Sequence, residues 1–265
     1  MMEKMIFGRY VPVDSVVHRM DPRSKLMVIF LFVCIIFLAN NWITYALIAI
    51  YTLFMLGLSR IPGRFLYTGL KPILWVVLFT LVLQILFTKE GHVVVSIGSV
   101  KIYNEGIKQG IFISLRFFFL ILMSSLLTLT TTPIEITDGL ETLLHPLKKI
   151  HFPVHEMALM MSISLRFIPT LMEETDKIMK AQMARGVEFG SGPYKERMKA
   201  VIPLLIPLFV SSFKRAEELA IAMEARGYRG GEGRTKYRQL YWRLADSLQL
   251  VALFGLTALL FLLRS

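Results

Sequence analysis

The sequence predicts an all-α, polytopic membrane protein with about five transmembrane helices, long helices on the cytoplasmic side and a small extracellular β-hairpin. Its 265 residues are 55% hydrophobic and only 18% charged, whereas charged residues make up roughly 25% of a typical soluble domain. The apolar residues form long runs, and residues 26–58 contain no acidic, basic or histidine side chain. The net charge of +11 fits basic cytoplasmic loops that attract anionic lipid. We therefore expect membrane lipids, and no nucleic acid, as partners of the basic surface.

The first two spans are predicted at residues 26–39 and 42–58. A transmembrane helix needs about 20 residues, so the uncharged run 26–58 is too long for one span and suits two short ones. The sequence Asn40-Asn41-Trp42 supplies the break, because a polar turn is followed there by an interfacial aromatic residue. Cys34 lies in the first span and has no second cysteine with which to form an intrachain disulfide.

Three further spans are predicted at residues 72–88, 109–131 and 245–263, and the second of these carries one charge, Arg116. Residues 200–213 are also apolar, but they are too few to span and contain two prolines that interrupt a helix. Between the third and fourth spans, two short β-branched runs flank Gly98-Ser99. This pattern predicts a hairpin with a type II′ turn.

Loop charges orient the spans. The first 25 residues carry five basic side chains, and residues 132–243 carry 17 Lys and Arg against 13 Asp and Glu. Both segments are therefore expected in the cytoplasm, and five spans then place the C-terminus outside. The predicted domains are an N-terminal transmembrane bundle at 1–131, a cytoplasmic-side helical domain at 132–243 and a C-terminal transmembrane helix at 244–265.

The cytoplasmic-side domain is predicted to contain three helices. The first is capped by Thr137 or Asp138 and runs through His145. The other two are long, at about 154–185 and 193–226, and internal prolines are expected to kink them. Each long helix has an apolar, proline-containing first half and a charged second half, which makes the pair a weak internal repeat.

Both long helices end in the same hexapeptide, A-x-x-A-R-G, at residues 181–186 and again 41 residues later at 222–227. Glycine can adopt the left-handed conformation that closes a helix, and arginine in the last turn is favoured by the helix dipole. The small alanines allow another helix to approach closely. The candidate docking residues are Ala184, Arg185, Gly186, Ala225, Arg226 and Gly227.

An ordinary helix cap is the alternative interpretation of each motif, since glycine after a basic last turn is common. Capping alone, however, requires only the final glycine. It does not require the two alanines that precede the glycine in each hexapeptide. Two matched copies favour a docking function, in which a carboxylate-lined groove on a partner receives a small surface with one projecting guanidinium. Lysine would replace that guanidinium poorly.

The sequence contains no recognisable catalytic or cofactor motif. A phosphate-binding G-x-x-x-x-G-K-[ST] is absent, as are a zinc H-E-x-x-H and a nucleophile elbow. We therefore expect no enzyme activity, no cofactor and no metal site, so that the energy for any work comes from elsewhere.

The pentapeptide Ile-Ser-Leu-Arg-Phe occurs at 113–117 and at 163–167, with Arg116 and Arg166 as its basic residues. A charge at membrane depth is a functional candidate by default. Packing within the bundle is the alternative, and the sequence leaves both open.

With its paired Ala-Arg-Gly motifs, the chain resembles the transmembrane (T) component of energy-coupling factor (ECF) transporters over essentially its whole length. The resemblance implies that the two long helices are coupling helices, and that each motif docks into a groove on one of two ABC-type ATPase subunits. It also implies that a separate substrate-binding S component is held on the membrane-facing side of these helices. The chain would then be a non-catalytic coupling subunit for vitamin or micronutrient uptake in the cell membrane of a prokaryote.

Two other classes of protein are alternatives. A conventional ABC permease that lines its own substrate pathway would need polar residues on several spans, which here offer Gln84, Gln109, Arg116 and scattered hydroxyls. A membrane enzyme, such as a lipid-modifying transferase, would need clustered acids or histidines near the interface. The motifs identify neither the vitamin or metal ion carried nor how many S components share the subunit.

Overall fold

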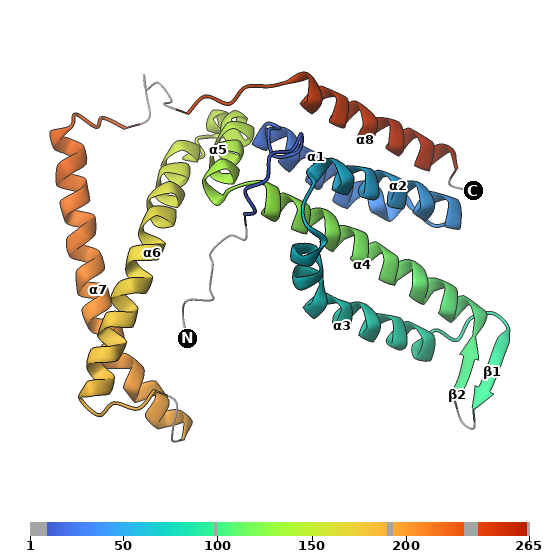
Figure 1. The fold of residues 1–265 in the computed structure, drawn as a ribbon, viewed down its shortest axis with the longest axis horizontal. Helices are drawn as coiled ribbons and strands as arrows, with labels where there is room; N and C mark the ends of the chain where they lie inside the picture. The colour runs from blue at the N-terminus through green and yellow to red at the C-terminus, as the bar shows by residue number, and fades with distance from the viewer. Residues whose placement is uncertain (1–9, 98–99, 190–192, 231–237, 264–265) are drawn as a thin grey trace. The chain divides into compact units, whose positions relative to one another are not determined.

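A computed structural model describes the chain apart from residues 1–9, 98–99, 190–192, 231–237 and 264–265 (Figure 1). The described chain is mostly helical and forms two compact units, which comprise the described residues of 10–142 with 239–263 and those of 143–238. The first unit contains α1 (Pro22–Ile35), the 3-10 helix η2 (Ile36–Leu38), α2 (Trp42–Ser59), α3 (Gly63–Phe87), β1 (Val93–Ile97), β2 (Val100–Tyr103), α4 (Asn104–Thr130), most of α5 (Pro133–Leu144) and α8 (Leu244–Leu262). The second contains the 3-10 helix η3 (His145–Ile150), α6 (Val154–Ala184) and α7 (Tyr194–Ala225).

All five predicted spans are helical, which confirms the all-α membrane fold. Among the described residues, α2, α4 and α8 are long and apolar enough to cross a membrane. The segment Ile73–Phe87 of α3 is a shorter apolar helix, and α1 with η2 covers the first predicted span. The number of spans that cross the membrane stays a prediction.

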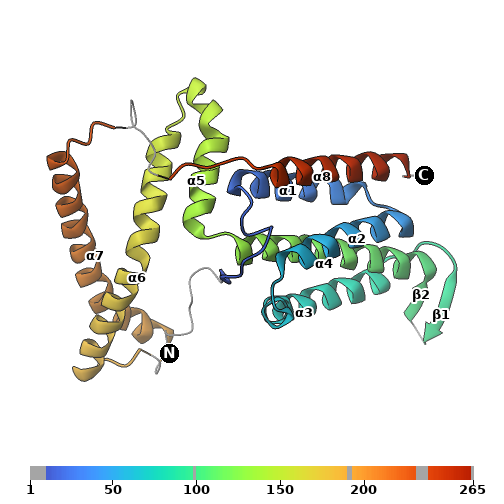
Figure 2. The same ribbon diagram turned by 45° about the horizontal axis from the view of Figure 1, so that its top comes forward.

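The bundle is organised around α4, which packs against α1, α2 and α3, while α8 packs against α1 and α2. Figure 2 shows α8 lying along α1. The core contains fully buried side chains from four of these helices, including Phe32, Ile48, Met123 and Leu253. These residues come from the apolar runs that predicted the spans.

A buried polar network joins the start of α1 to α8. The carboxylate of Asp246, which is fully buried, accepts hydrogen bonds from the Asp21 N–H at 2.9 Å and the Ser24 hydroxyl at 2.6 Å. It also accepts one from the Arg243 N–H at 2.7 Å, which caps α8. Buried polar groups persist in proteins when they are paired in this way.

Lys25 extends this network to the end of α4. Its Nζ donates to the Thr130 carbonyl at 3.0 Å and to the Thr131 hydroxyl at 3.2 Å. Lys25 precedes the apolar run, and its burial lowers its pKa to about 8, because desolvation disfavours the charged form.

The predicted cap of α5 is wrong. The helix begins at Pro133, and Thr132 caps it through a reciprocal pair of hydrogen bonds with Glu135. The Glu135 N–H donates to the Thr132 hydroxyl at 3.3 Å, and the Thr132 N–H donates to the Glu135 carboxylate at 2.9 Å. This is a capping box with proline at the first helical position, and Thr137 lies inside the helix.

The predicted hairpin is present. Strands β1 and β2 pair antiparallel, with Val93 opposite Tyr103 and Ile97 opposite Val100. Gly98 and Ser99, for which a type II′ turn is predicted, lie outside the described residues.

Candidate docking site at the ends of α6 and α7

The two long helices of the second unit lie close to their predicted positions. They run from Val154 to Ala184 and from Tyr194 to Ala225. Both remain helical through their internal prolines, Pro169 in α6 and Pro203 and Pro207 in α7.

Contacts between the two helices define an antiparallel register. The Gln182 amide donates to the Pro203 carbonyl at 3.5 Å, and the Ser211 hydroxyl donates to Glu174 at 3.1 Å. From the first contact to the second, the residue number falls by eight on α6 and rises by eight on α7, so the two helices run in opposite directions. Figure 1 shows the consequence, because the C-terminal ends of α6 and α7 lie at opposite ends of the crossed pair.

An ion pair between Glu174 and Arg215 marks the centre of the pair. These residues are 41 positions apart, which is also the spacing of the two hexapeptides. Glu174 and Arg215 occupy the same position in the two copies of the repeat. In two antiparallel helices, such equivalent positions can meet only near a local two-fold axis. The repeat therefore makes the pair of helices approximately symmetric. Arg185 and Arg226 each follow this centre by eleven residues, or about 17 Å of helix.

The first hexapeptide closes α6 with a Schellman motif. The Gly186 N–H donates to the Met183 carbonyl at 3.0 Å, and the Val187 N–H donates to the Gln182 carbonyl at 3.0 Å. Gly186 has φ of +86°, which confirms the left-handed conformation expected from the sequence.

The second hexapeptide closes α7 with the same geometry. The Gly227 N–H donates to the Glu224 carbonyl at 2.8 Å, and the Tyr228 N–H donates to the Met223 carbonyl at 3.0 Å. Gly227 has φ of +74°, and the preceding Arg226 has φ and ψ of −88° and 9°, against −87° and 5° at Arg185. The two Ala-Arg-Gly ends, residues 184–186 and 225–227, are the tips of the helix pair, and they have the same backbone conformation.

All six candidate docking residues are exposed. A Cβ added to Gly186 or Gly227 would meet nothing within 4 Å, so glycine is needed there for backbone conformation and not for space. Within the described part of the chain, neither Arg185 nor Arg226 forms an ion pair. Each tip thus presents one unpaired guanidinium, whose planar fork can bind a carboxylate through two hydrogen bonds.

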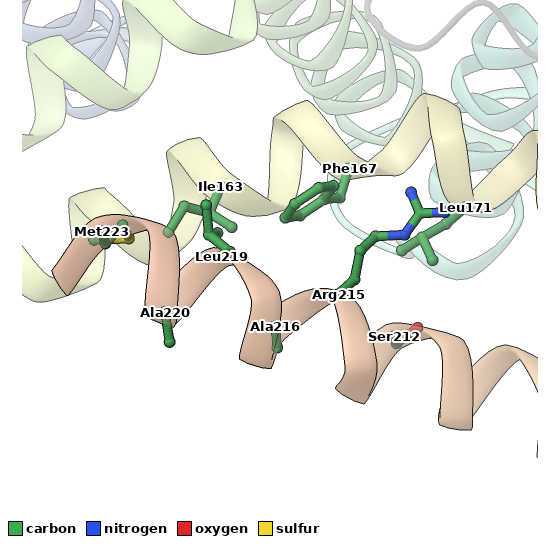
Figure 3. Close-up of a pocket in the computed structure, with 9 residues that line it drawn as sticks. All are labelled: Ile163, Phe167, Leu171, Ser212, Arg215, Ala216, Leu219, Ala220 and Met223. Atoms are coloured by element: carbon green, nitrogen blue, oxygen red, sulfur yellow. The ribbon is translucent and has the colours of Figure 1, made fainter. Parts of the chain in front are cut away.

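An apolar pocket of about 290 Å³ lies between α6 and α7 (Figure 3). Ile163, Phe167 and Leu171 line it from α6, and Leu219 and Met223 from α7. The side chains of Phe209, Val210 and Phe213 on α7 are also about two-thirds exposed. Exposed apolar surface on this scale is typical of a site that contacts a partner or lipid.

Sequence reasoning missed the Glu174–Arg215 pair, although both residues belong to the charged halves of the repeat. The two residues occupy the same position in the two copies of the repeat and have opposite charges. This pattern predicts an ion pair only once the two helices are known to be antiparallel. The two arginines of the repeated pentapeptide take different positions. Arg166 is exposed on α6, and Arg116 belongs to the bundle unit.

Comparison with known proteins relates the chain to one family of transporters. Residues 14–237 match the family model described as cobalt transport protein, CbiQ. The chain is 68% identical over 265 residues to an energy-coupling factor transporter transmembrane protein, EcfT, of Bacillus subtilis, and 58% identical over 265 residues to that of Listeria innocua, with both chains of each pair fully covered. It is 54% identical over 261 residues to the protein of Lactococcus lactis, covering 98% of both chains.

Proposed function

The chain belongs to the CbiQ family and is an ECF transporter transmembrane component. We propose that it is the non-catalytic coupling subunit of an ECF-type importer. In this proposal two ABC-type ATPase subunits supply the energy. A separate S component binds the vitamin or other micronutrient, and the chain transmits motion from the ATPases to the S component.

The matched pair of tips is the observation that carries the proposal. Two exposed Ala-Arg-Gly ends share one backbone geometry and lie at opposite ends of one antiparallel helix pair. A partner present in two similar copies would find the same shape and charge at each end. An ordinary helix cap accounts for each glycine and each arginine, but not for the matched alanines or for the recurrence of the whole motif at both ends.

The helix pair also supports the mechanical part of the proposal. Displacement of a tip moves a continuous helix, because hydrogen bonding makes each helix stiff along its axis. The Glu174–Arg215 pair couples the helices at their centre, so that movement of both tips changes the angle at which they cross. The apolar surface of α6 and α7 is the part that would contact the S component and respond to that change.

The proposal assigns a place to each part of the chain. Residues 1–131 and 244–265 form the transmembrane bundle, and residues 132–243 carry the coupling helices. The N-terminus and both tips face the cytoplasm, where ATP is available, and the C-terminus is extracellular.

The deciding experiment reverses the charge of both tips. We expect Arg185→Glu with Arg226→Glu to abolish co-purification of the ATPase subunits and substrate uptake, because a carboxylate would then face the carboxylates of the groove. Membrane insertion should be unchanged. Lys177→Glu is the matched control, since Lys177 is an exposed residue of α6 away from its tip. Undiminished ATPase binding by the double variant would refute docking through the tips.

A further inference from the structure

A basic side chain that the coupling proposal does not use lies within the bundle unit. Arg116 belongs to α4, one of the helices long and apolar enough to cross a membrane. Of the five N–H donors of a guanidinium, one has an acceptor among the described residues, the Ala39 carbonyl at 3.3 Å. The Phe37 ring lies 5.0 Å from the guanidinium carbon. No described carboxylate forms an ion pair with this cation.

A second donor beside Arg116 also lacks an acceptor. The Tyr45 hydroxyl faces the guanidinium closely enough to interact with it electrostatically, but the two groups do not meet the geometry of a hydrogen bond. In the described part of the chain, both the Tyr45 Oη and the Arg116 Nε are buried without a hydrogen-bond partner. The Tyr45 ring is held in place by stacking on Phe112 at 4.9 Å. Unsatisfied buried donors are unfavourable, so this cluster is short of acceptors.

Arg116 lines a pocket of about 340 Å³ at the end of α4 that follows the hairpin. Lys108 and Gln109 line it from the same face of α4, and Asn40 lines it from the turn before α2. Glu105 contributes the only carboxylate among the lining residues, against the two cations Lys108 and Arg116. The pocket is therefore rich in donors and carries a net positive charge.

The depth of Arg116 in the bundle is suited to a lipid headgroup. Arg116 lies fourteen residues before Thr130, or about 21 Å along α4, whereas the hydrocarbon layer is about 30 Å thick. Side chains of a helix tilt toward its N-terminus, which here is the end that follows the hairpin. The long arginine side chain therefore reaches toward the membrane surface at that end, as snorkelling residues do.

We infer that this pocket binds the phosphate of an anionic phospholipid in the leaflet at the hairpin end of the bundle. The phosphate oxygens supply acceptors to Arg116 and Lys108, and the acyl chains lie along the apolar surface of α4. A free phosphate ion offers the same oxygens but has no apolar part. The inference does not depend on the proposed coupling function.

Lipid retention tests this inference. The complete chain is purified from nanodiscs of phosphatidylcholine with a minor fraction of phosphatidylglycerol, and bound lipids are counted by native mass spectrometry. Arg116→Gln removes the central cation, and Lys108→Gln removes an exposed one without disturbing the core. Arg166→Gln is the matched control, because Arg166 lies in the same pentapeptide but on α6.

We expect selective retention of phosphatidylglycerol, reduced about fivefold by Arg116→Gln and by Lys108→Gln and unchanged by Arg166→Gln. Equal retention by the wild type and both pocket variants would overturn the inference, as would equal retention of phosphatidylcholine. Displacement of the lipid by inorganic phosphate would identify a free anion as the ligand instead. Cross-linking of a cysteine at position 108 to another protein chain, in place of lipid, would identify a protein interface.

Discussion

At the scale of single residues, the glycines of the two tips are the positions where one atom decides the local structure. Gly186 and Gly227 have positive φ and open space around the Cβ position. A substitution there tests backbone conformation separately from steric fit.

We predict that Gly227→Ala weakens ATPase binding about tenfold, because alanine in the left-handed conformation costs about 1–2 kcal/mol. Gly227→Asn should bind nearly as well as the wild type, since asparagine tolerates this conformation. Titration of the purified ATPase onto each variant measures the difference. If the Gly227→Asn variant bound the ATPase more weakly than the Gly227→Ala variant, the size of the side chain, and not the backbone φ, would determine which residues are tolerated at this position.

Lys25 gives a prediction about pH. Its folded pKa of about 8 lies below the ordinary value of 10.5, so between these values the unfolded state binds more protons than the folded state. Stability must then rise with pH in that window, by about 1–2 kcal/mol between pH 8 and pH 9.5. Thermal unfolding in detergent should show this rise in the wild type, and Lys25→Met should lose it. An identical pH dependence in both would contradict the burial of this charge.

At the scale of elements, the Glu174–Arg215 pair is expected to couple α6 to α7. Its side chains are only 24% and 30% exposed, so solvent screens it less than a surface pair. We predict that Glu174→Arg alone lowers stability by about 1 kcal/mol or more through like charges, and that adding Arg215→Glu restores it. A double-mutant cycle on thermal stability and on uptake measures the coupling.

The Lys180–Asp176 pair provides the matched control for this cycle. It lies within α6 at 2.7 Å, and its side chains are 69% and 40% exposed. Reversing both of its charges should leave uptake unchanged, because both residues of the pair belong to α6. Equal effects in the two cycles would mean that Glu174–Arg215 is an ordinary surface ion pair.

Helix positions could be predicted from the sequence wherever apolar runs define them, but the starts of α3 and α4 could not. The third span is predicted from residue 72, yet α3 begins at Gly63, and α4 begins at Asn104, before the predicted residue 109. In both cases the helix extends past the apolar run into polar residues, which hydropathy cannot see. The tips were found because glycine, arginine and alanine each have a local physical role, whereas Glu174–Arg215 depends on a tertiary register.

For the molecule as a whole, the coupling proposal determines how the tips and the bundle are oriented in the membrane. The coupling proposal requires the tips on the side where ATP is available and the hairpin on the other. Loop charges predict this arrangement, because Lys and Arg near span ends are retained in the cytoplasm. The orientation is therefore a test of the whole scheme and not of one residue.

We predict that a cysteine at Lys89, exposed after α3, reacts with a membrane-impermeant maleimide in intact cells. One at Lys149, exposed in η3, should react only after the cells are permeabilised. The background is Cys34→Ala, which removes the single natural thiol. Because two predicted spans, α4 and α8, lie between position 89 and the C-terminus, a cysteine added after Ser265 should label like position 89 if both helices cross. Labelling like position 149 would mean that α8, the one predicted span between position 149 and the C-terminus, does not cross.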